Sequence, residues 1–116
     1  MNLVTKILIS TLAVLLTAYI LPGVKVDGFL TAVVVAAVLA FLNAVVKPLM
    51  ILFTIPITIL SLGLFLMVIN ALIILLAAKL VDGFVVRGFW WAILFSIILS
   101  ITNSVFESIL NEKNEK

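Results

Sequence analysis

Two stretches of the chain decide its fold: residues 23–45 read GVKVDGFLTAVVVAAVLAFLNAV and residues 83–105 read GFVVRGFWWAILFSIILSITNSV. Three sets of residues match between them, each 60 positions apart: Gly23 and Gly83, Gly28-Phe29 and Gly88-Phe89, and Asn43 and Asn103. The same offset aligns residues 3–49 with 63–109 without a gap. Self-similarity at one fixed period is typical of a duplicated unit, so we predict two repeats in tandem.

The composition is that of a membrane protein. Of 116 residues, 66% are hydrophobic and 10% are charged, and the mean hydropathy is +1.52. A water-soluble domain of this size has a large surface for its volume and needs more polar residues to cover it. The length predicts a single membrane domain over residues 1–116.

Each predicted repeat contains two apolar stretches of the length that crosses a bilayer, about 20 residues. They cover about residues 3–21 and 29–47 in the first repeat, and about 63–81 and 89–108 in the second. We therefore expect an all-α membrane protein whose four transmembrane helices form two helical hairpins. Because each repeat crosses twice, the repeats are parallel and both termini lie on the same side.

An apolar connector over about 49–62 separates repeat 1, about 3–49, from repeat 2, about 63–109. It is too short to span a bilayer. Prolines interrupt it, and Pro56 disfavours helix at the preceding Ile55. We expect an interfacial or re-entrant connector here, and a frayed polar tail over 110–116.

The basic residues indicate an orientation. The terminal face is predicted to carry Lys6, Lys47, Lys113 and Lys116, and the opposite face Lys25, Lys79 and Arg87. Four against three favours cytoplasmic termini under the positive-inside rule. The expected location is the bacterial cytoplasmic membrane, with the lipid bilayer as the first partner.

Several function classes are disfavoured by what the sequence lacks. It contains no Cys and no His, which removes the thiol nucleophile, the usual metal ligands and the usual base near neutral pH. The acids, Asp27, Asp82, Glu107, Glu112 and Glu115, all lie outside the middle of the apolar runs. The net charge of +2 comes from scattered residues. We expect no enzyme activity, no metal or other cofactor, no nucleic-acid partner and no identifiable small-molecule substrate.

A stripe of small residues runs along the second helix of each repeat at a spacing of four. The stripes are Ala32, Ala36, Ala40 and Ala44, and Ala92, Ser96, Ser100 and Ser104. Such spacing puts them on one helix face, where two backbones can approach closely. The stripes predict either a packing seam within the chain or a face on which several copies associate.

Four polar residues fall at similar depth inside the predicted spans: Ser10, Asn43, Asn70 and Asn103. An amide in hydrocarbon must find a partner, because an unmade hydrogen bond there costs several kcal/mol. The layer predicts either interhelical hydrogen bonds or a polar ring lining a path open to water or solute.

The hairpin loops carry turn signals at Pro22, Gly23, Gly28, Gly83 and Gly88. The Val-rich residues between them suit short extended segments, and the two loops can pair edge to edge. Equivalent positions carry opposite charges, Asp27 with Arg87 and Lys47 with Glu107. These pairs either form ion pairs that join the halves or are simply solvated.

Three motifs resemble those of a known family. They are AYILPGVKVDGF over 18–29, LAFLNAVVKPL over 39–49, and IPITILSLGLF over 55–65 followed by INAL over 69–72. Together they resemble the YvlD-type bacterial membrane proteins, grouped with the four-span mycobacterial phage holins of holin superfamily IV. The likeness extends over about residues 5–108.

The resemblance implies a holin-like protein that is not an enzyme, associates with itself and perturbs the membrane. Holins open lesions in the cytoplasmic membrane that release a lytic enzyme. An envelope structural or interaction protein without lytic activity is the alternative. A small channel or transporter using the Asn layer is a weaker third hypothesis, because the chain lacks the charged mid-membrane residues such pathways commonly use.

Overall fold

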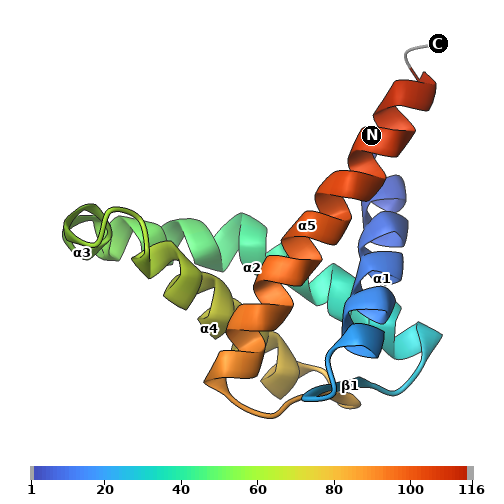
Figure 1. Cartoon of the computed structure of the whole chain (residues 1–116), viewed down its shortest axis with the longest axis horizontal. Helices are drawn as coiled ribbons and strands as arrows, with labels where there is room; N and C mark the ends of the chain where they lie inside the picture. Colours follow the sequence, from blue (N-terminus) through green and yellow to red (C-terminus); the bar gives the residue numbers. More distant parts are fainter. Residues whose placement is uncertain (1, 115–116) are drawn as a thin grey trace.

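The computed structural model describes residues 2–114, with side chains described through Leu110. Its elements in chain order are α1 (Leu3–Ile20), β1 (Val24–Val26), α2 (Phe29–Phe53), α3 (Ile55–Leu60), α4 (Phe65–Leu80), β2 (Phe84–Val86) and α5 (Phe89–Asn114). In Figure 1 the helices extend from the end of the molecule at which β1 lies. The fold is helical, as expected, with two three-residue strands in the predicted hairpin loops.

Three helices are long and apolar enough to cross a membrane within the described residues: α1, α2 and the Phe89–Leu110 part of α5. The fourth apolar helix, α4, has 16 residues and is about 24 Å long at 1.5 Å per residue. This set fits a four-span membrane protein.

The four long helices pack as a ring, in which α1 contacts α2 and α5, and α4 contacts α2 and α5. The faces that they bury follow the 60-residue offset. Buried positions are Ile9, Thr11, Ala13, Val14 and Thr17 in α1, and Ile69, Ala71, Ile73, Ile74 and Ala77 in α4. Helices α1 and α4 therefore present equivalent faces to the centre.

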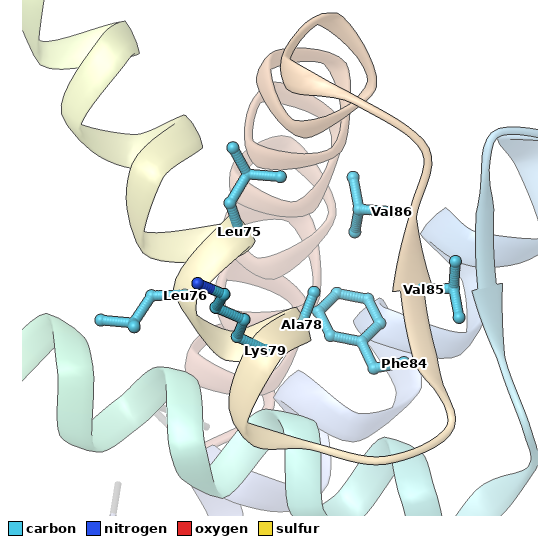
Figure 2. A pocket seen from close by; sticks show the side chains of 7 residues that line it. All are labelled: Leu75, Leu76, Ala78, Lys79, Phe84, Val85 and Val86. Carbon is cyan, nitrogen blue, oxygen red and sulfur yellow. The ribbon is translucent and has the colours of Figure 1, made fainter.

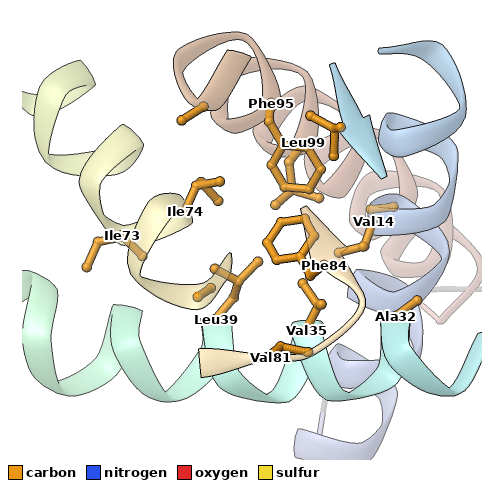
Figure 3. Close-up of a cluster of buried hydrophobic side chains, with 14 of the residues drawn as sticks. Val14, Ala32, Val35, Leu39, Ile73, Ile74, Val81, Phe84, Phe95 and Leu99 are labelled. Carbon is orange, nitrogen blue, oxygen red and sulfur yellow. The ribbon is translucent and has the colours of Figure 1, made fainter. Parts of the chain in front are cut away.

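The centre of the ring is a hydrophobic core closed at one end by β2. The rings of Phe84 and Phe95 pack with their centroids 5.5 Å apart at an interplanar angle of 53°. Figure 3 shows Phe84 between Phe95 of α5 and Val35 of α2. Phe84 of β2 thus joins α2 to α5 through the core.

The hairpin loops pair with each other, which confirms the edge-to-edge prediction. Strands β1 and β2 are antiparallel, with Lys25 opposite Val85 at the centre. The ribbon is extended at both ends, because Asp27 N donates to Gly83 O at 3.0 Å and Arg87 N to Gly23 O at 2.9 Å. The two donors, Asp27 and Arg87, are 60 positions apart, and so are the two acceptors, Gly23 and Gly83. Each loop therefore donates one of these bonds and accepts the other.

The ribbon lies at one end of the molecule, and the helices spread from it toward the other (Figure 1). The N-terminal end of α1 and the C-terminal end of α5 lie together on the upper right. The C-terminal end of α2 and the short helix α3 lie on the left. In this view α2 and α5 cross, and their C-terminal ends lead to opposite sides.

Three helix boundaries differ from the predictions. Helix α2 continues through Pro48 to Phe53, and Ile55 begins α3 with Pro56 in its first turn. A proline is tolerated in a first turn because the amide it lacks has no intrahelical partner there. Helix α5 continues to Asn114, so the predicted frayed tail is helical through this residue; 115 and 116 lie outside the described residues.

Candidate functional site

The small-residue stripes are covered along only half of their length. Near the ribbon their members are buried: Ala32, Ala36, Ala92 and Ser96. Farther along, Ala40 and Ala44 of α2 and Ser100 and Ser104 of α5 are exposed.

Hydroxyl groups near the core are mostly paired within their own helices. Thr11 and Thr17 donate to the carbonyls of Ile7 and Ala13 at 2.7 Å. Ser96 donates to the carbonyl of Ile93 at 2.8 Å. Bonds of this kind satisfy a polar side chain without help from another helix, so these hydroxyls do not lock the ring together.

The predicted Asn layer meets at a cavity between α2, α4 and α5. The cavity has a volume of about 90 Å³. Its polar lining residues are Asn43, Lys47, Asn70, Ser96, Ser100 and Asn103, and its apolar ones are Leu39, Ile73, Ile74 and Leu99. Ser10, the fourth predicted member, lies on α1 and does not line it.

No amide of this layer is satisfied by a neighbouring helix. Among the described side chains, Asn43, Asn70 and Asn103 make no hydrogen bond to another residue. Asn103 Oδ1 is buried and lacks a protein donor. A polar cavity larger than about 15 Å³ has room for water, so the amides face a space that water or a polar group can fill.

Lys47 is the charged residue in the lining of this cavity. Within the part of the chain whose side chains are described, no carboxylate oxygen lies within 4.0 Å of a basic nitrogen. The suggested ion pair of Lys47 with Glu107 is therefore not formed.

The suggested ion pair of Asp27 with Arg87 is also absent, and the ribbon explains why. Antiparallel pairing puts Asp27 beside Gly83 and Arg87 beside Gly23, at opposite ends of the ribbon. Both charged side chains are exposed. Within the ribbon, residues 60 positions apart therefore lie opposite each other only at its centre.

The loop glycines serve distinct purposes. Gly28 and Gly88 have φ of 144° and 150°, backbone angles that side chains disfavour, and each precedes a second helix. Gly23 lies against the indole of Trp91, which leaves no space for a Cβ. Beyond the glycine itself, nothing in the sequence indicates this contact. Pro22, next to it, is exposed.

A second groove adjoins the polar cavity. It has a volume of about 380 Å³ and shares Asn43 and Lys47 with the cavity. The rest of its lining is apolar: Pro48, Ile51, Leu52 and Ile55. The polar cavity and the apolar groove therefore meet at Asn43 and Lys47.

A third groove lies near the ribbon, between the last turns of α4 and strand β2 (Figure 2). It has a volume of about 580 Å³, and Lys79 is the charged residue in its lining. Its other lining residues are Leu75, Leu76, Ala78, Phe84, Val85 and Val86. This groove lacks the convergent polar side chains of the cavity, so the cavity is the better candidate site.

The residues that line the polar cavity are suited to binding a ligand. Among the described residues, no three His, Cys, Asp or Glu side chains gather as metal ligands. The cavity offers amides, hydroxyls and one ammonium, which are hydrogen-bonding groups. Lys47 follows Asn43 by four residues in the sequence. In a helix this spacing predicts that the two side chains share a face.

One family and two relatives match the chain over most of its length. Residues 1–105 match the family described as mycobacterial 4 TMS phage holin, superfamily IV. The chain is 33% identical over 112 residues to the uncharacterized membrane protein YvlD of Bacillus subtilis (strain 168), covering 96% of this chain and 94% of that protein. It is 35% identical over 119 residues to an uncharacterized protein of Streptomyces coelicolor, covering 94% and 95% respectively. No solved structure matches.

Proposed function

The chain belongs to the superfamily IV family of four-span phage holins, and from this membership we propose that it associates with copies of itself in the bacterial cytoplasmic membrane and perturbs the bilayer without acting as an enzyme. The resemblance found in the sequence is confirmed by the match over residues 1–105. Its membrane-crossing helices make it an integral membrane protein.

The observation that carries the proposal is the exposed half of the two stripes. Ser104 exposes a hydroxyl on a helix that crosses the membrane, and Ala40 and Ala44 leave the backbone of α2 accessible. Lipid offers such groups no hydrogen bonds. Small residues let helices approach closely, and helix association in membranes depends on such packing. A second copy of the chain supplies a matching surface.

The proposed membrane arrangement is two parallel hairpins in one domain. Helices α1 and α4 bury residues at positions 60 apart, which supports residues 63–109 as a second copy of the unit 3–49. The helical segment that ends α2, with α3, then serves as the interfacial or re-entrant connector over about 49–62. Both termini lie on the cytoplasmic side and the ribbon on the other, in keeping with the basic residues.

Disulfide crosslinking in membranes tests the association directly, because the natural chain contains no Cys. Ala44→Cys and Ser104→Cys are expected to give covalent dimers or larger species on mild oxidation. Val105→Cys is the matched control, since Val105 is exposed at the same depth but lies about 100° around the helix. Crosslinking at 105 but not at 44 or 104 would contradict the proposed face.

Membrane potential in the same induced cells separates the two functions. Depolarisation that is lost in Ser104→Leu supports the holin-like activity. Crosslinking without depolarisation supports the envelope structural or interaction protein instead. A chain that stays monomeric at every expression level contradicts self-association and leaves the envelope structural or interaction protein as the alternative.

A further inference from the structure

The polar cavity and the adjoining apolar groove meet at Asn43 and Lys47. We propose that together they form a binding site for one anionic phospholipid. The phosphate lies on Lys47 and the neighbouring amides, and an acyl chain lies in the groove along the end of α2. This site is independent of the self-association proposed above, because it is built within one copy of the chain.

The headgroup end of the site is chemically suited to an anion. Lys47 contributes the charge, and Asn43 and Asn70 contribute amide donors. No carboxylate lines the cavity, so the ammonium has no competing partner there. Hydrogen bonds between charged groups and phosphate oxygens are among the stronger ones. A cationic or neutral ligand would leave this lysine without a counter-charge.

Asn103 extends the headgroup end inward. Its buried Oδ1 lacks a donor within the described residues, and a phosphate cannot supply one. A glycerol hydroxyl, or a water held between the headgroup and Asn103, can. The inner end of the cavity therefore favours a headgroup with a hydroxyl, such as that of phosphatidylglycerol.

The depth of Lys47 agrees with a lipid phosphate. Lys47 comes 18 residues after Phe29, about 27 Å along the axis of α2. The hydrocarbon core of a bilayer is about 30 Å thick. The ammonium thus lies close to one edge of this core, where a flexible lysine side chain can reach phosphates.

The groove distinguishes a lipid from a free anion. Four apolar residues, Pro48, Ile51, Leu52 and Ile55, continue from Lys47 along α2 into α3. A free phosphate gains nothing from this surface, whereas an acyl chain covers it. The continuity of the two spaces therefore favours an amphiphile with its charge at Lys47.

The test counts lipids on the purified full-length chain by native mass spectrometry. The chain is released from detergent after incubation with equal amounts of dioleoyl phosphatidylglycerol and dioleoyl phosphatidylcholine. We expect one phosphatidylglycerol to be retained in preference to phosphatidylcholine. Lys47→Gln should reduce this retention about fivefold, the effect of one basic residue at a lipid surface. Lys79→Gln is the matched control, because Lys79 lines an apolar groove without amides.

Two further measurements complete the test. Leu52→Trp fills the groove without touching the charge, and it should weaken retention while elution in gel filtration and far-ultraviolet dichroism stay unchanged. Inorganic phosphate at millimolar concentration should not displace the lipid. Equal retention of both lipids, no effect of Lys47→Gln, or a loss in Lys79→Gln as large as that in Lys47→Gln would each overturn the proposal. Displacement by inorganic phosphate would also overturn it, by indicating a free-anion site.

Discussion

The indole of Trp91 lies flat against Gly23, so that the first turn of α5 closes over the loop that leaves α1. The Arg87 amide donates to the Gly23 carbonyl at 2.9 Å in the same place. A side chain at position 23 would collide with Trp91. The contact joins the first hairpin loop to the last helix, far apart in the sequence.

Gly23→Ala is expected to lower the free energy of unfolding by about 1–3 kcal/mol, the usual cost of forcing a group into filled space. Titration with sodium dodecyl sulfate in mixed micelles, followed by tryptophan fluorescence, measures it. Trp90 keeps the signal when Trp91 is replaced. In a Trp91→Ala background the same substitution should cost much less, because the ring it strikes is gone. Equal costs in both backgrounds would show that Trp91 is not the cause.

Phe84→Ala removes the residue that joins β2 to the core. Phe84 is 2% exposed and Phe95 is 0% exposed, so truncating either ring should cost about 3–5 kcal/mol. Because the rings touch, the double variant should cost less than the sum of the two. Phe41→Ala is the control: its ring is 61% exposed and faces away from the core. Similar losses at 41 and 84 would refute the placement of the core.

The buried faces could be predicted from the sequence because two periodicities agree. Helical spacing fixes which residues share a face, and the 60-residue offset transfers that face from α1 to α4. The extended loop segments followed from their valines and bounding glycines. Their pairing followed from the expected two-fold relation between the repeats.

Helix ends could not be predicted in the same way. Residues 49–62 are as apolar as the helices that flank them, so hydropathy does not mark where α2 stops. Prolines suggested a break, but Pro48 lies within α2. An unpaired backbone group is costly in hydrocarbon, which favours keeping the remaining helical hydrogen bonds around a proline.

The suggested ion pair of Asp27 with Arg87 failed for a reason of symmetry. In an antiparallel ribbon made of equivalent strands, a residue meets its own equivalent only at the centre, where Lys25 faces Val85. For every other equivalent pair, the offset along the ribbon grows by two residues with each step from the centre. The position of Lys47 in the cavity likewise depends on which helices neighbour α2, and the sequence does not state that.

A charge test follows for Asp27 and Arg87. Because they lie at opposite ends of the ribbon, Asp27→Asn and Arg87→Gln should act independently. The double variant should match the sum of the single ones to within about 0.5 kcal/mol in the free energy of unfolding. Exchanging the two residues should bring no rescue. A coupling energy above about 1 kcal/mol between the two positions, measured by the same detergent titration, would show that the ion pair does form.

Asn103→Leu tests whether the amide layer stabilises the fold. Asn103 Oδ1 has no donor among the described residues, so the apolar variant removes an unsatisfied acceptor and loses no interhelical bond. The free energy of unfolding should therefore stay within about 0.6 kcal/mol, the mean worth of a hydrogen bond between membrane helices. Asn103→Asp keeps the shape of the side chain but adds a charge, so it should be clearly destabilising in the same titration. If the leucine variant loses as much stability as the aspartate variant, Asn103 has a partner in the folded chain, and the layer holds the helices together.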